Sequence, residues 1–233
     1  MKLTRKLLAS SIAAAAITAS TFVPSANAEG ELSASMAIAS SYHWRGLDLG
    51  SGTPAVSGSL DYSIAGFYTG MWVSSGDTTG GTEYDLYVGY AGSLGDFSYD
   101  ISYVTYVYPT QTLIGFEEPI SETDGTPGDF AEVILRLGFG PVSAFYHDNV
   151  AGETGGYAFD EDYRYFGASV SVDAFSATIA KHDTDQVANF VHLDLGYSYN
   201  DNLSFLLSVP VDSDEGYFEP EPKFVASYSF DIK

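Results

Sequence analysis

The chain has no cysteine, few cations and no long apolar run after its first residues. Without cysteine, a disulfide framework and thiolate-based zinc or redox sites are excluded. Nine Lys and Arg stand against 31 Asp and Glu, which argues against nucleic acid or an anionic membrane surface as a partner. Beyond the N-terminus no stretch reaches the ~18 consecutive apolar residues of a spanning helix. A membrane could therefore be crossed only by strands.

The N-terminus has the features of a secretory leader. Three cations precede an apolar stretch over 7–23, and Ala26-Asn27-Ala28 fits a small-x-small cleavage site. A membrane anchor is the weaker interpretation, because the stretch is followed by Pro24 and then by a polar chain. We therefore predict a signal peptide over 1–28 and a single domain over 29–233, which carries six cations against 31 acids.

Apolar and polar residues alternate with a period of two through most of the domain. In segment 189–199, Val191 and Leu193 point one way, whereas His192 and Asp194 point the other. About twelve such stretches occur, each near the ~9–11 residues of a tilted membrane strand. The predicted strands cover 32–45, 55–65, 66–75, 82–91, 97–108, 130–139, 141–148, 163–173, 174–182, 189–199, 202–209 and 222–232.

The connections between these strands are alternately short and long. This order predicts an all-β, transmembrane, antiparallel up-and-down barrel with short periplasmic turns and long outer loops. A soluble Greek-key sandwich would not sort its loops in this way. The long connections, which hold most of the acidic residues, are 46–54, 76–81, 109–129, 149–162, 183–188 and 210–221.

One strand face is apolar and rich in Tyr and Phe, as expected for a face turned to lipid. Segment 67–73 is apolar on both faces and cannot be oriented. The last strand, from Phe224 to Ile232, alternates like an outer-membrane assembly signal, although the chain ends at Lys233. The predicted lipid face includes Val56, Leu60, Tyr62, Ile64, Tyr84, Leu86, Val88, Tyr90, Tyr99, Ile101, Tyr103, Val133, Leu135, Leu137, Phe139, Leu203, Phe205, Leu207 and Val209.

The opposite face carries charges. Burying five carboxylates on one strand face of a soluble protein would cost several kcal/mol for each, whereas a water-filled lumen removes that cost. The surplus of acids predicts a cation-preferring pore. A closed barrel, in which the carboxylates pair with Arg and Tyr, stays open as an alternative. The predicted pore-lining residues are Arg45, Asp61, Asp85, Asp100, Glu132, Arg136 and Asp194.

Enzyme and metal signatures are weak. Residues 50–55 fit the letters of a G-x-G-x-x-A loop, but a strand pattern follows instead of a helix. No G-x-S-x-G elbow occurs, and the four histidines lack zinc spacing. The acidic pairs at 160/162, 183/185 and 212/214 could bind a hard cation, but none completes a calcium loop, which favours solvated acid. We predict no enzyme activity, no cofactor and no metal site.

The N-terminal third carries a set of motifs that is specific in combination. They are Ser41-Tyr42-His43-Trp44-Arg45-Gly46, the block over 54–62, Gly66-Phe67-Tyr68-Thr69-Gly70-Met71-Trp72-Val73-Ser74, the block over 83–90, and Tyr103 to Pro109. Over about 31–109 the chain resembles the TorF porin family, a conserved proteobacterial outer-membrane family of unknown function. The resemblance implies an outer-membrane barrel and a porin, and it makes Arg45 the first pore residue to test.

These observations predict a passive channel in the outer membrane for small cationic or neutral solutes. Its constriction would be Arg45 facing Asp61, Asp85 and Asp194, with a structural ion pair between Arg45 and Asp61 as the alternative role. A plugged barrel that acts in adhesion or envelope structure through acidic loops is the second hypothesis, and a soluble periplasmic ligand-binding barrel is the third. Expected partners are outer-membrane lipid, lipopolysaccharide and small solutes.

Overall fold

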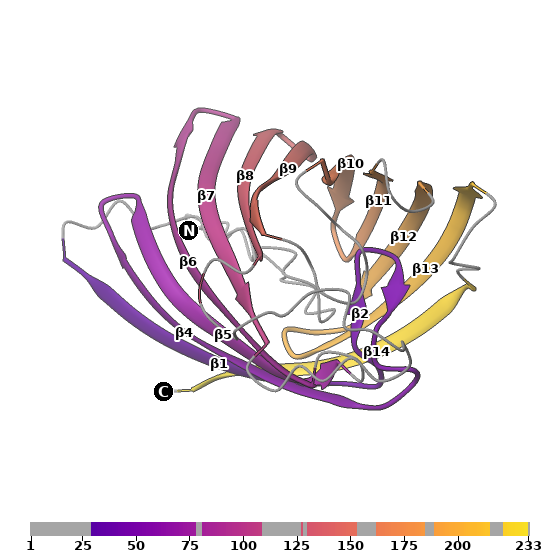
Figure 1. Cartoon of the computed structure of the whole chain (residues 1–233). Coiled ribbons are helices and arrows are strands. Elements are labelled where there is room, and N and C mark those ends of the chain that lie inside the picture. Colours follow the sequence, from indigo (N-terminus) through magenta and orange to yellow (C-terminus); the bar gives the residue numbers. More distant parts are fainter. Residues whose placement is uncertain are drawn as a thin grey trace, which may run out of the picture.

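The structure is a computed structural model that describes residues 29–77, 81–108, 127, 130–152, 162–184, 189–214 and 221–232. The predicted leader and most of the acidic connections lie outside these residues. The fold is all-β: twelve strands form a closed barrel, and a short two-stranded hairpin, β2 (His43–Trp44) with β3 (Leu47–Asp48), lies within the ring (Figure 1). The described residues contain no helix long and apolar enough to cross a membrane.

Each barrel strand pairs antiparallel with the next one along the chain, and β1 closes the ring against β14. The predicted twelve-stranded, up-and-down barrel is therefore confirmed. Short turns lie at one end of the barrel, here called the turn end, and the strand ends that the long connections join lie at the other, the loop end. The strands are β1 (Glu31–Ala39), β4 (Ala55–Ile64), β5 (Phe67–Asp77), β6 (Gly81–Leu94), β7 (Phe97–Val107), β8 (Phe130–Phe139), β9 (Val142–Gly152), β10 (Arg164–Val172), β11 (Phe175–Asp183), β12 (Phe190–Ser198), β13 (Leu203–Ser213) and β14 (Lys223–Ile232).

The first predicted strand, 32–45, is wrong in its second half. β1 ends at Ala39, which pairs with Ala55 at the start of β4. The chain between them leaves the barrel wall and folds inward, where Tyr42, Trp44 and Leu49 are buried. We call residues 41–50, which contain β2 and β3, the latch hairpin. Its apolar side chains account for the hydrophobic character that continues beyond the end of β1.

The outer face is apolar along its whole circumference. Val88, Ile101 and Leu135 are 52%, 51% and 41% exposed, and they lie on adjacent strands with the outward orientation expected from the alternation. The register of β5 with β6 now orients the ambiguous segment 67–73: Trp72 pairs with Asp85 and faces inward, whereas Met71 faces outward. The segment is apolar on both faces because Trp72 stacks on Tyr42 of the latch hairpin at a centroid distance of 6.2 Å.

The interior differs between its two ends. Around the latch hairpin, the loop-end half is packed with buried aromatic and aliphatic side chains, among them Tyr106, Ile134 and Phe190. Toward the turn end the inward face carries half-buried hydroxyls, such as the Ser35–Ser59 pair at 2.9 Å. The predicted water-filled lumen is thus wrong for the loop-end half of this structure, because the chain's own hairpin fills it.

Candidate functional site

The tip of the latch hairpin is a two-residue turn formed by Arg45 and Gly46. Their φ angles are 48° and 88°, as the primed hairpin turns that match strand twist require. Left-handed backbone costs a residue such as Arg45 about 1 kcal/mol. Gly46 is needed for space as well, because a Cβ there would lie 2.7 Å from Cγ of His192. The turn projects the Arg45 side chain into the barrel interior.

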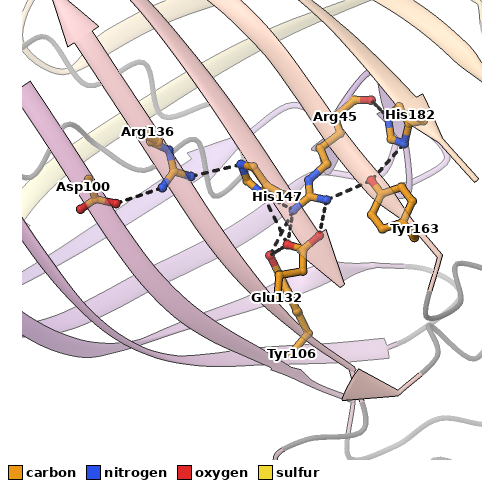
Figure 2. Close-up of polar contacts among 8 residues, drawn as sticks. All are labelled: Arg45, Asp100, Tyr106, Glu132, Arg136, His147, Tyr163 and His182. Atoms are coloured by element: carbon orange, nitrogen blue, oxygen red, sulfur yellow. Dashed lines mark hydrogen bonds and ion pairs between the residues drawn. The ribbon is translucent and has the colours of Figure 1, made fainter. Parts of the chain in front are cut away.

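Arg45 forms a bidentate ion pair with Glu132 of β8. Nη1 donates to Oε1 at 2.8 Å and Nη2 to Oε2 at 2.5 Å, with the two side chains 6% and 0% exposed (Figure 2). The hydroxyl of Tyr106 donates to Oε2 at 2.7 Å. Two parallel charge-assisted bonds fix both the position and the plane of a guanidinium. The hairpin tip is therefore held by its side chain.

A ring of hydrogen bonds starts and ends at Arg45. Nη1 donates to the Tyr163 hydroxyl at 2.9 Å, and this hydroxyl lies 3.1 Å from Nδ1 of His182. Nε2 of His182 lies 2.7 Å from the Arg45 carbonyl, which can only accept. The proton of His182 therefore lies on Nε2, and Tyr163 donates to Nδ1. Nη2 also bonds Nδ1 of His147 at 2.9 Å, so that nitrogen is an acceptor.

Aromatic rings enclose the guanidinium. Its central carbon lies 4.4 Å from the ring centroid of Trp44, 4.7 Å from that of Tyr165 and 5.7 Å from that of Tyr163, all within cation–π range. Burial alone would lower the pKa of Arg45, but the Glu132 carboxylate outweighs burial and raises that pKa above its ordinary value. Arg45 therefore stays charged while it is buried.

The base of the hairpin is held by separate polar contacts. Tyr42 donates a hydrogen bond to Glu83, and Ser41 donates one to Asp48. Asp48 also pairs with Lys223 at the start of β14, 3.3 Å away. Burial would raise the pKa of Asp48, but the bonds from Ser41 and the Gly52 amide, together with Lys223, lower it.

Two buried polar side chains of this region differ from the others. Among the described residues His43 has no hydrogen-bond partner, and Asp85 lies beside a second buried carboxylate, that of Glu83. His43 is 1% exposed on the hairpin, and burial lowers its pKa to about 4. The titratable groups around it are Asp194 and His192 of β12, Asp48 of β3 and Lys223 of β14. The unpaired, neutral His43 imidazole can therefore take a proton only after the groups packed around it have moved away.

The structure pairs Arg45 with Glu132 and not with Asp61. Arg45 lies on the hairpin and not on the wall, and its ion pair with Glu132 shows that the alternative Arg45–Asp61 ion pair is wrong. Asp85 is near enough to Arg45 for a charge interaction, and the constriction of Arg45 against Asp61, Asp85 and Asp194 stays a prediction. Asp61 instead accepts hydrogen bonds from Tyr87 and, at 2.7 Å, from Ser59. The reason is that a hairpin tip reaches the opposite wall, whereas a wall residue reaches only its neighbours.

The remaining predicted pore residues face inward on the barrel strands. Asp100 accepts from Tyr68 at 2.7 Å and pairs with Arg136 at 3.5 Å. Asp194 lies 3.0 Å from Nδ1 of His192 and accepts from Ser208. Asp100, Arg136 and Asp194 are only partly buried, in contrast to Glu132 and Asp85.

The residues that complete the Arg45 site were not among the predicted ones. They are Tyr106 of β7, His147 of β9, His182 of β11 and Tyr163, which lies just before β10. An inward-facing aromatic or histidine in the loop-end half of a strand is the sequence signal that could have found them. No group of three or more His, Asp or Glu side chains that could hold a metal occurs among the described residues, and positions 160 and 185 of the acidic pairs lie outside them.

A family model described as "Bacterial protein of unknown function (Gcw_chp)" matches residues 24–205, and the chain belongs to this family. The match does not test the TorF name, which stays a prediction. A search of curated proteins finds no match.

Several solved barrels are similar in arrangement. A KdgM porin is 6% identical, with 87% of this chain and 100% of that chain covered and a TM-score of 0.47. Outer membrane phospholipase A from Escherichia coli is 10% identical, with 86% of this chain and 90% of that chain covered and a TM-score of 0.41. A porin refined at 1.8 Å is 15% identical, with 76% of this chain and 62% of that chain covered and a TM-score of 0.37. We base no functional assignment on these likenesses.

Replacing Glu132 by Gln should release the hairpin while the barrel stays folded. An uncompensated buried guanidinium costs about 3–5 kcal/mol, which corresponds to roughly a 100-fold or greater rise in the released fraction. Trypsin cleavage after Arg45 measures that release, because this bond is protected when the tip is buried. Asp61→Asn, a carboxylate change away from the tip, is the control and should leave cleavage unchanged. Equal resistance of both variants would contradict the role of the ion pair.

Acid should loosen the hairpin through His43. Because the folded pKa of about 4 lies below the ordinary value of 6.5, the unfolded form binds more protons between these values. Stability is therefore full above about pH 6.5 and falls as pH drops toward 4, by up to roughly 3 kcal/mol.

Acrylamide quenching of Trp44 in a Trp72→Phe background follows this loosening without a pH-dependent probe. His43→Leu removes the unpaired imidazole and should make the quenching of Trp44 depend less steeply on pH. At neutral pH the hairpin should stay as firmly buried as in the natural chain. An unchanged pH profile in His43→Leu would show that other groups are responsible.

Proposed function

We propose that the protein is an outer-membrane channel for small solutes whose opening depends on release of the latch hairpin. One observation carries the proposal: the packed, loop-end half of the interior is filled by a hairpin of the chain itself, held at its tip by a single buried ion pair. A barrel needed only as a rigid wall could be filled by side chains from its strands. Here the filling element is covalently connected to the wall through residues 40 and 51–54, and its other contacts with the wall are non-covalent.

The outer face supports a position in a bilayer. Large apolar side chains that are 40–60% exposed, such as Val88, Ile101 and Leu60, would be costly in water over so large a surface. In lipid the same face is stabilising, and the closed ring leaves no strand edge unpaired. Lipid and lipopolysaccharide are the partners we infer for it, with the loop end outward.

The interior charge favours cationic or neutral solutes. Among described residues, inward carboxylates outnumber cations, so an open pore has a surplus of negative charge. Part of this surplus, Asp61 and Asp100, lies in the hydroxyl-lined half, which the hairpin does not fill. The carboxylates are Asp48, Asp61, Glu83, Asp85, Asp100, Glu132 and Asp194, and the cations are Arg45, Arg136 and Lys223.

The second function is a permanently closed barrel with a structural or adhesive role through its acidic connections. The burial of Trp44 of the hairpin in one apolar cluster with Tyr163 and Phe190 supports it. Neither function needs a catalytic residue, so phospholipid hydrolysis by the pure barrel would contradict both.

Conductance in planar bilayers separates the two functions. Residues 40–54 can be replaced by Asn-Gly, because Ala39 and Ala55 are paired and a two-residue turn closes such a hairpin. We expect rare openings from the natural chain and steady current from the replaced one, with a reversal potential that shows cation preference. If a folded barrel without the hairpin carries no current, the second function, a closed barrel with a structural role, is favoured.

Selectivity of the open variant tests the charge argument. Asp61→Asn with Asp100→Asn should weaken the cation preference, since these carboxylates face the open half. Outward-facing Asp148→Asn is the matched control and should leave the reversal potential unchanged.

Position in the bilayer is tested by placing one cation on each face. Leu135→Lys should destabilise the barrel in phospholipid vesicles by about 2–4 kcal/mol, as for a cation at mid-bilayer depth. Ser169→Lys, on the inward face of β10, should cost far less. Free energies of unfolding from urea titration in vesicles give the comparison, and equal costs for the two variants would contradict a lipid-facing exterior.

A further inference from the structure

The groups that hold the Arg45 guanidinium come almost entirely from the barrel wall. Glu132 lies on β8, Tyr106 on β7 and His147 on β9, with Tyr163 just before β10 (Figure 2). The fifth residue, Tyr165, lies on β10. We call these five residues the socket. The hairpin contributes only the guanidinium and the Trp44 ring. Receptor and occupant therefore belong to separate parts of the fold.

The chemistry of the socket is specific for a flat, fork-shaped cation. Glu132 accepts two parallel bonds, at 2.8 and 2.5 Å, and the Tyr163 hydroxyl and Nδ1 of His147 accept one each at 2.9 Å. The ring of Tyr165, 4.7 Å from the guanidinium carbon, supplies a π face. An ammonium ion is a compact point charge and matches neither the fork nor the flat face.

We propose that the socket is a binding site for guanidinium-bearing solutes and that Arg45 occupies it as an internal ligand in the closed barrel. A solute with a free guanidinium group competes with Arg45 for Glu132 and thereby favours the released hairpin. This second step rests on the proposed channel function, whereas the binding site itself does not.

The binding site is tested by emptying the socket of its internal ligand. In detergent, Arg45→Ala should bind methylguanidinium at one site by titration calorimetry, roughly 100-fold or more tighter than the natural chain, whose tethered Arg45 competes at high effective concentration. Methylammonium at equal ionic strength should bind at least about tenfold more weakly, because it loses one charge-assisted bond. Adding Glu132→Gln to Arg45→Ala should abolish binding.

If Arg45→Ala does not fold, the Asn-Gly replacement of 40–54 presents the same socket and serves instead. A folded variant that does not distinguish methylguanidinium from methylammonium, or that binds equally well with Glu132→Gln, overturns the proposal.

Coupling to the channel has its own measurement. Methylguanidinium should raise the open probability of the natural chain in bilayers, and this rise should be absent in Glu132→Gln. Calorimetric binding to a barrel that never conducts would support the binding site and refute the channel function. Conductance without selective binding of methylguanidinium would support the channel function and refute the binding site.

Discussion

The buried pair of Arg45 and Glu132 determines how the interior is arranged. Removing two charges from water costs several kcal/mol for each, and attraction repays this only when the geometry is good and the remaining donors are satisfied. Both conditions are met, because the carboxylate accepts two parallel bonds and Tyr163 and His147 take further guanidinium protons. Trp44 packs against the Tyr163 ring beside this pair, and Gly46 lies close to His192.

Strand number, order and facing could be predicted from the sequence because they depend on local alternation. A shift of one residue would turn a whole strand, such as β8 with Leu135 outward and Arg136 inward, to the wrong side. The free-energy cost of exchanging the two faces is large, so the alternation of apolar and polar residues is well marked in the sequence. The alternation of short and long connections adds the topology, since adjacent antiparallel strands need only a short turn.

The hairpin and its socket could not be predicted in the same way. Two short strands have the same period as one long strand, so the pattern continues past Ala39 without a visible break. The Arg45-Gly46 turn lacks the usual Asn-Gly or Asp-Gly signal. Glu132 lies 87 residues from Arg45, and only closure of the barrel brings them together. Trp72 was ambiguous for the same reason, since its inward partner is the hairpin.

The pairing of Ala39 with Ala55 means that both ends of the hairpin leave the wall at one point. If such an element is released, it can turn only about this one point of attachment. Its polar tip contacts all involve Arg45, most of them through one guanidinium, so we expect them to break together and not one after another. Current through such a barrel would switch between two levels without a stable intermediate, and the time spent at each level would measure the strength of the attachment directly.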